Sequence, residues 1–386
     1  MGGSLRLGKI LGIDIRLHYS WFLIFAFVTL SFYTDFQDAD YSAPISLGMG
    51  LVASFLIFAS VVAHELSHSI VAIRSGIPVK SITLFILGGV ANITKEAERP
   101  KTEMLMAIAG PLCSLALGLA SGAAWFATGG HHEDATAFHD LLFWMAALNL
   151  SLGVFNLLPG FPMDGGRVLR GILWQRTRNY RKATHIASIG GQVIGWLMVG
   201  AGVAIAVSYL VGRTVTADDI LDAIFNGGYF VLLGWFLSSI AVSSYRQVEW
   251  REAMQGITAA SAMVSDFMTI SPDMSLMQLV RDYMQPNRHR SFVVATEGRF
   301  QGVVNVENIR RIPQNRWDMT PAGLIMTPAS KVITVPPEEE GINIAEKLEE
   351  HRLVGIPVVR DGVVLGMVTR NSLARVMQMR TQFGTR

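Results

Sequence analysis

The feature that most constrains this chain is the uneven distribution of its apolar residues. From about residue 17 to residue 243 the sequence is mostly apolar, whereas residues 245–386 have the charged and polar content of an ordinary soluble domain. The apolar part contains six segments near the length of about 20 residues that a helix needs to cross a bilayer. They are, approximately, 17–34, 46–74, 103–128, 140–160, 186–210 and 223–243. We therefore predict a membrane domain of six transmembrane helices and exclude a disordered chain.

Lysine and arginine residues predict the orientation of these helices. The connections on one side of the membrane are rich in them: 1–16, 75–102 and 161–185. The connections on the other side contain only Arg213: 35–45, 129–139 and 211–222. By the positive-inside rule, both termini and the polar tail lie in the cytosol, and the protein is a multi-pass protein of the cytoplasmic membrane. The net charge of +2 is small and spread out, so we expect no nucleic-acid partner.

The polar tail contains an internal repeat. Met268-Thr269 in one copy matches Met326-Thr327 in the other, and each copy alternates strands with amphipathic helices. Gly298 and Gly302 match Gly362 and Gly366, and each pair surrounds a turn between two β-branched runs. This doubled α/β pattern resembles a pair of CBS domains. The expected domains are a membrane domain (1–244), a polar linker (245–257) and tandem CBS domains (258–380, with copies at about 258–312 and 320–380).

A metal-binding pattern lies inside the second apolar segment. His64, Glu65 and His68 form an H-E-x-x-H pattern, in which the two histidines are one helical turn apart on the same face. Such side chains converge on one point and suit a tetrahedral zinc ion, and the adjacent glutamate can act as general base. The alternative, two histidines that merely pair with polar groups in the core, is weak because ionisable groups within an apolar span are costly.

The third zinc ligand is harder to identify from spacing. The chain has a single cysteine, Cys113, so a thiolate-rich site is excluded. No ligand candidate follows closely after His68, and the best one is Asp164, beyond a Pro-Gly-Phe-Pro interruption at the end of the fourth segment. An Asp-Gly pair is also common in turns, so on this evidence alone both interpretations of Asp164 stay open.

Three motifs together resemble the site-2 protease family (peptidase family M50), whose members are intramembrane zinc metalloproteases. They are His64-Glu-x-x-His68 in the second segment, Ala109-Gly110-Pro111 in the third, and Asn156-x-x-Pro159 followed by Met163-Asp164-Gly165 in the fourth. One branch of this family has six spans followed by a CBS pair, so the resemblance covers nearly the whole chain. Met163 departs from the leucine more common in the family, a change that conserves volume.

The resemblance implies a role for each matched residue. His64, His68 and Asp164 would bind one Zn²⁺ per chain, and Glu65 would be the general base. Asn156 would bind the substrate backbone or the oxyanion, and an equally good alternative is a hydrogen bond that ties two helices together. The substrate would be a membrane protein that is cut in or near a transmembrane helix.

Residues between the second and third segments predict a β-hairpin. Ser81–Ile86 is β-branched and aromatic, and Gly88-Gly89 ends this strand before a second short run. In the family, a sheet at this place dips into the membrane and accepts the substrate as an added strand. The resemblance therefore implies substrate binding at Gly88 and Gly89, and a purely structural hairpin is the alternative.

The ligand of the CBS pair is less constrained. Such modules commonly bind adenine nucleotides, with a hydroxyl residue and an aspartate at the end of each copy. The corresponding positions here are Asn305 and Asn308 in the first copy and Thr369 and Ser372 in the second, so the ribose-binding aspartate is absent from both. Thr369 is the best candidate contact. Dimerisation of two chains, or docking of substrate, is the alternative role.

Two other functions are compatible with parts of the sequence. A CBS-gated transporter or channel would share the tail, but such proteins usually have inverted repeats with paired interrupted helices, which this sequence lacks. It would also leave the four candidate site residues unexplained. A catalytically inactive relative is the other alternative, although every expected catalytic group is present.

Overall fold

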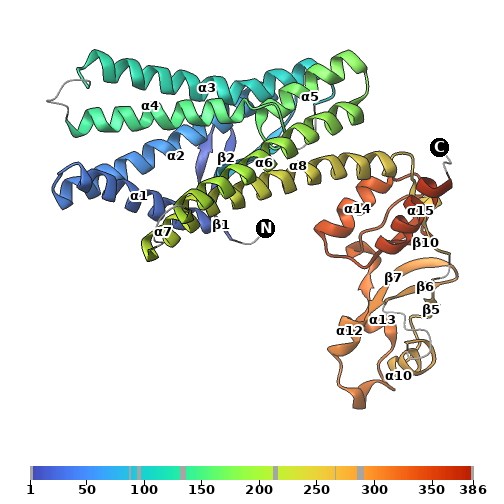
Figure 1. Cartoon of the computed structure of the whole chain (residues 1–386). Helices are drawn as coiled ribbons and strands as arrows, with labels where there is room; N and C mark the ends of the chain where they lie inside the picture. The colour runs from blue at the N-terminus through green and yellow to red at the C-terminus, as the bar shows by residue number, and fades with distance from the viewer. Residues whose placement is uncertain are drawn as a thin grey trace. The chain divides into compact units, whose positions relative to one another are not determined.

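The computed structural model describes residues 3–86, 88–93, 97–130, 136–211, 216–265, 267–284 and 291–383. Residues 131–135 and 212–215, in two of the predicted external connections, lie outside this set. The chain divides into two compact units, Met1–Val248 and Glu249–Arg386. Long helices dominate the first unit, and a mixed sheet with short helices forms the second (Figure 1).

In the described part of the first unit, five helices are long and apolar enough to cross a membrane. They are α2 (Ala43–Arg74), α3 (Pro100–Ala127), α4 (Ala137–Asn156), α6 (Tyr180–Leu210) and a helical run over Asp219–Met254. The last comprises the end of α7 (Ala217–Asp222), a π-helical turn (Ala223–Gly227) and α8 (Gly228–Met254). These five agree with five of the six predicted spans.

The first predicted span, 17–34, is not confirmed as a helix long and apolar enough to cross a membrane. It forms the helix α1 (Ser20–Asp38), which is not among the five candidate spans. Asp35, Gln37 and Asp38 occupy its last turn, so the apolar stretch is shorter than in the other helices. Helix α1 nonetheless packs along α2, where the Thr29 hydroxyl donates a hydrogen bond to the Ser54 hydroxyl at 2.9 Å. It therefore belongs to the bundle, but the count of six spans remains a prediction.

A four-stranded sheet accompanies the helices, in the order β1 (Ser4–Ile10), β2 (Ile13–His18), β3 (Val79–Phe85) and β4 (Gly88–Ile93). The predicted hairpin is the antiparallel pair β3–β4, and β2 runs parallel to β3. The sequence analysis did not predict β1 and β2, since it treated residues 1–16 only as a cytosolic connection. The signal was present: Ile13, Ile15 and Leu17 alternate with polar residues and are at most 5% exposed.

The second unit contains the predicted repeat. Its sheet has the order β5 (Thr269–Ile270), β6 (Ser291–Thr296), β7 (Arg299–Asn305), β10 (Val363–Thr369) and β9 (Gly355–Arg360), with β8 (Thr327–Pro328) paired to β7. Gly298 and Gly362 have the same φ of +81° in the β6–β7 and β9–β10 turns, which supports their equivalence. Strands β7 and β10 join the two copies in one sheet.

Each copy also contributes a short helix to the core of the other. Ala259 and Ala262 of α9 (Ala259–Ala262) are buried with Ile356 and Val368 of the second copy. Ala322 of α13 (Ala322–Ile325) is buried in the core of the first copy. The remaining α-helices are α10 (Leu276–Gln278, continued by a π-helical turn), α12 (Val306–Arg310), α14 (Gly341–Glu350) and α15 (Arg370–Phe383). This exchange explains why the two copies behave as one compact unit.

The predicted linker 245–257 is mostly helical. Helix α8 continues through its polar residues and ends at Met254, which is buried in the core of the second copy. Only Gln255, Gly256 and Ile257 lie between this helix and Thr258, the N-cap of α9. The charged residues that suggested a polar linker are instead the polar surface of a helix.

Candidate metal centre

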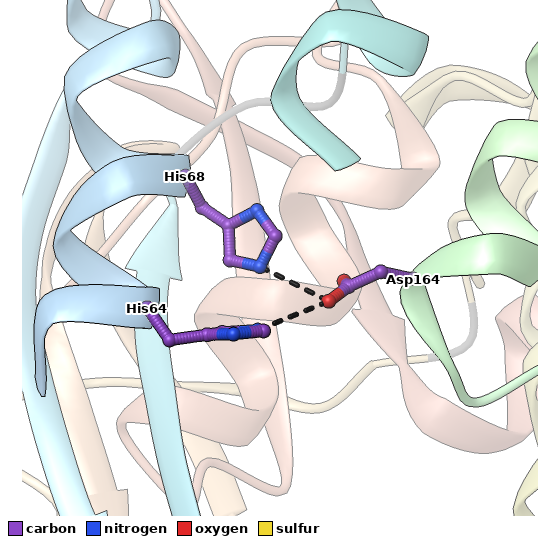
Figure 2. Close-up of side chains that lie close together, drawn as sticks. All are labelled: His64, His68 and Asp164. Carbon is purple, nitrogen blue, oxygen red and sulfur yellow. Dashed lines mark hydrogen bonds and ion pairs between the residues drawn. The ribbon is translucent and has the colours of Figure 1, made fainter. Parts of the chain in front are cut away.

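His64 and His68 lie one turn apart on α2, within the apolar bundle. Their side chains are buried, at 5% and 6% exposure. Both rings present Nε2 to the same oxygen, Oδ2 of Asp164, at 3.2 Å and 3.1 Å (Figure 2). The three ligand-type atoms lie within 4.8 Å of one another, and they form the one candidate metal cluster among the described residues. The structure thus brings together the three residues that the sequence proposed as ligands, and their binding of zinc stays a prediction.

Asp164 reaches the histidines from an element far away in the sequence. It is the first residue of α5 (Asp164–Thr177) and follows the interrupted loop after α4. The backbone N–H of Phe161 in this loop donates to the Ala187 carbonyl of α6 at 3.1 Å. An added Cβ at Gly191 would lie only 1.8 Å from the Phe161 carbonyl oxygen, so α6 and the loop touch at their backbones. This anchoring fixes the position of the carboxylate.

Each histidine is oriented by a partner on α3. Nδ1 of His64 is 2.8 Å from the Ser114 hydroxyl, and Nδ1 of His68 is 2.6 Å from the Met106 carbonyl oxygen. A carbonyl can only accept, so Nδ1–H of His68 donates, and the neutral ring then has its lone pair on Nε2. A partner of this kind at the second nitrogen is typical of metal-binding histidines.

The donor set therefore fits a bound cation. In neutral His68 the Nε2 lone pair faces a carboxylate oxygen at 3.1 Å, and two electron-rich atoms repel each other unless a cation or a proton lies between them. Two imidazoles and one carboxylate are the ligands of many catalytic zinc sites.

A glycine on α3 leaves room in front of the ligand atoms. A Cβ at Gly110 would lie 2.3 Å from Nε2 of His68 and 2.6 Å from Nε2 of His64. Any other residue would therefore collide with both ligand atoms. From the sequence, Gly110 was identified only as part of a motif, and Ser114 and Met106 were not identified. A Gly-Pro pair inside an apolar helix was the available signal for the first, and no local pattern marks the other two.

Glu65, the candidate base, lies next to the strand β4. A Cβ at Gly89 would be 2.6 Å from Cγ and 3.4 Å from Oε1 of Glu65, so the backbone of β4 approaches this carboxylate closely. Gly88 opens the strand with a φ of +125°. Asn156 donates from Nδ2 to the Leu152 carbonyl of its own helix at 3.0 Å. That bond matches neither sequence-based interpretation of Asn156, and a contact with substrate stays a prediction.

The second unit contains a cavity of about 1010 Å³ between its two copies. Its lining includes Asn305 of the first copy and three cationic residues, Arg310, Lys331 and Arg352. Thr369 is not among the lining residues. Its hydroxyl accepts a hydrogen bond from the Ser372 N–H at 3.1 Å, and Ser372 bonds back to the Thr369 N–H at 3.0 Å. Thr369 thus caps α15, and its contact with a nucleotide stays a prediction.

Comparisons with known proteins agree with this arrangement. The sequence matches "Peptidase family M50" over residues 52–135 and 130–198, which include all four candidate site residues. It matches "CBS domain" over residues 259–315 and 322–378.

The similarity to curated relatives extends over the whole chain. Two of them carry the name "Putative zinc metalloprotease". The first, sll0528 of Synechocystis sp., is 34% identical over 98% of this chain and 96% of its own length. The second, Rip3 of Mycobacterium tuberculosis, is 29% identical over 98% of this chain and 94% of its own length. "Zinc metalloprotease MJ0392" of Methanocaldococcus jannaschii is 28% identical, with 98% and 97% covered.

Proposed function

Because this chain belongs to peptidase family M50, we propose that it is an intramembrane zinc metalloprotease that cuts other membrane proteins within or beside their transmembrane segments. One observation carries the proposal: His64, His68 and Asp164 converge on one point inside a bundle of apolar helices. Ionisable groups are costly there and are retained for function.

The three converging residues would hold one Zn²⁺ per chain. His64 and His68 supply Nε2 atoms whose rings are fixed by Ser114 and Met106, and Asp164 supplies the carboxylate. Bound zinc would act as a Lewis acid that activates water and polarises the scissile carbonyl. Glu65 would accept the proton from the attacking water and return it to the leaving amine. Glu65 directly follows His64 on α2, so it lies beside the proposed zinc site.

The substrate would bind as an added strand on β4. A transmembrane helix must unwind before its carbonyl group can react, and its freed backbone then needs new hydrogen-bond partners. Two observations support this docking mode. In the described sheet β4 is an edge strand, paired only with β3, and Gly89 on β4 approaches Glu65. A strand paired to this edge would pass close to the base, with Gly88 and Gly89 among its contacts.

The cavity of the second unit would bind an adenine nucleotide. Arg310, Lys331 and Arg352 offer charges to phosphates, and apolar lining residues such as Val332 and Leu353 offer a surface to the base. Nucleotide binding there would regulate cleavage, and the CBS pair would also mediate a homodimer. We expect isothermal calorimetry on the full chain to detect weak ATP or AMP binding that is reduced in Thr369→Ala. Absence of heat at millimolar nucleotide would contradict this role.

The protein would lie in the cytoplasmic membrane with both termini in the cytosol. The lysine and arginine asymmetry supports this orientation. A cysteine introduced at 216 should react with an impermeant thiol reagent in intact cells, and one introduced at 300 should not. The opposite labelling pattern would reverse the orientation.

A cleavage assay with a Glu65→Gln variant tests the proposed function. The amide keeps the shape of the side chain and all three ligands, so we expect zinc content to stay at one per chain. Cleavage of a single-span substrate should fall by about 10²- to 10⁴-fold because the base is lost. Glu98→Gln, at an exposed position of the same unit, is the matched control and should have normal activity. Normal turnover of Glu65→Gln would refute the assigned mechanism.

A further inference from the structure

A buried ion pair lies close to the metal centre without belonging to it. Glu103, in the first turn of α3, is 1% exposed. Arg170 of α5 donates to its Oε1 from Nε at 2.6 Å and also from Nη2. Oε2 of Glu103 is buried and accepts no hydrogen bond from the described residues. The carboxylate therefore depends on this one arginine.

The guanidinium of Arg170 also contacts two aromatic rings. Its central carbon lies 4.9 Å from the ring centre of Phe161 and 4.8 Å from that of Tyr180. A planar cation over an aromatic face is attracted by the ring electrons, and arginine makes this contact better than lysine. Arg170 thus holds a glutamate of α3, the loop before α5 and the start of α6 at the same time.

These contacts lead directly to the parts that orient the zinc ligands. Glu103 lies one helical turn before Met106, whose carbonyl accepts the hydrogen bond from His68. Phe161 lies three residues before Asp164, in the loop that α6 anchors. The ion pair therefore connects the backbone that orients one histidine with the loop that carries the third ligand.

Stability alone does not explain a pair of this kind. Removing two charges from water costs as much as their attraction returns, and an apolar pair of similar volume is often at least as stable. A buried ion pair can instead fix the relative position of its two residues, because the hydrogen bonds between them are directional.

We propose that Glu103 and Arg170 are positioning residues that hold Asp164 in register with the two histidines, an inference that rests on the proposed zinc site. Outer contacts of this type typically change metal affinity by about 10- to 100-fold. The described hydrogen bonds and ring contacts of this pair do not include His64, His68 or Asp164, so both residues would act through Phe161 and Met106.

The test is the zinc dissociation constant of the full chain in detergent, measured by competition with a chelator. Arg170→Gln is expected to raise this constant about 10- to 100-fold. Arg176→Gln, the same substitution at an exposed position of the same helix, is the matched control and should leave it unchanged. Equal zinc affinity in the two variants would overturn the inference.

The same substitution in an Asp164→Ala chain separates a positioning role from a general structural role. Because Asp164→Ala removes the route through Phe161 and leaves only the one through Met106, Arg170→Gln should have a smaller effect on zinc affinity in an Asp164→Ala chain. An equal fold-change in both backgrounds would overturn the inference.

Arg170→Gln leaves Glu103 buried without a partner and so threatens folding. Glu103→Gln together with Arg170→Gln removes that unpaired charge and should fold, yet it still lacks the cation over Phe161. We expect this double variant to show the weakened zinc affinity, and wild-type affinity would contradict the proposal. If the unmodified chain itself bound no zinc, the proposed function would fail, whereas normal zinc binding in Arg170→Gln would refute only this inference.

Discussion

The candidate metal centre of the first unit and the cavity of the second differ in how their polar groups are held. At the metal centre the two histidines are at most 6% exposed, and each ring nitrogen has one defined neighbour. In the cavity, Arg310, Lys331 and Arg352 are exposed and the space is large, about 1010 Å³. Buried polar groups without partners are costly, so a buried site specifies its ligand almost atom by atom. An open cavity specifies only a class of ligand.

This difference predicts very unequal effects of mutation, and the largest belong to the ligands. His68→Ala removes one of three donors and leaves a cavity among polar groups. We expect zinc affinity to fall by well over the about 10- to 100-fold that is typical when a residue outside the ligand set is changed, and we expect cleavage to be abolished. Zinc content and cleavage of the same preparation provide the measurement. Full zinc occupancy in His68→Ala or in Asp164→Ala would remove that residue from the ligand set.

Gly110→Ala tests whether the space before the ligand atoms matters. The new Cβ would lie 2.3 Å from Nε2 of His68, so the helix or the ring must shift. A displacement of about 1 Å at a reacting centre costs on the order of 100-fold in rate. Gly122→Ala on the same helix is the matched control, because its Cβ would meet only Ala146 at an ordinary 3.6 Å. Equal activity of the two variants would contradict the proposed geometry.

Ser114→Ala removes the hydroxyl beside Nδ1 of His64 without touching the metal. We expect zinc affinity or cleavage to fall by about 10- to 100-fold. Cys113→Ala changes the preceding residue and should have little effect, since the structure assigns Cys113 no role at the site. Unchanged zinc affinity and cleavage in both alanine variants would contradict a role for the Ser114 hydroxyl in orienting His64.

Gly89→Ala tests the close approach of β4 to Glu65. Its Cβ would press on Cγ of Glu65, so we expect cleavage to fall by about tenfold or more while zinc stays bound. Gly8→Ala, on β1, is the matched strand control, because its Cβ would meet nothing within 4 Å. Zinc loss in Gly89→Ala would show that β4 supports the metal rather than the base.

The smallest effect is expected in the cavity of the second unit. Lys331→Ala removes one exposed charge among three, and solvent screens such charges. We expect nucleotide affinity to weaken only about two- to fivefold, as exposed ion pairs commonly show. Calorimetry would measure it, with Lys347→Ala outside the cavity as control. A complete loss of binding would show that the cavity is as specific as the metal centre.

The residues of the candidate metal centre could be predicted from the sequence only in part. The i, i+4 spacing identified His64 and His68, because a helix places such residues on one face. Asp164 needed the family resemblance, since no local rule connects positions 96 residues apart. Ser114 and Met106 escaped because a hydroxyl and a backbone carbonyl carry no distinctive pattern in an apolar helix.

The fold was predicted unevenly for similar reasons. The length of the apolar segments correctly indicated five helices that could cross a membrane. Helix α1 is not among them, because Asp35 and Asp38 lie in its last turn and shorten its apolar stretch. The repeat was found from glycines that turns require, whereas the exchange of short helices between the copies has no local signal. Strands β1 and β2 show that a weak period-two pattern at a terminus is easily overlooked.

The central claim is that His64, His68 and Asp164 bind one zinc ion. X-ray absorption at the zinc edge, on the purified full chain with its metal content measured, tests it most directly. We expect one zinc per chain, bound by nitrogen and oxygen donors that include two imidazoles. Any zinc that His64→Ala retains should have one imidazole fewer. A zinc-free active protein, or a shell with the same two imidazoles in His64→Ala, would contradict it.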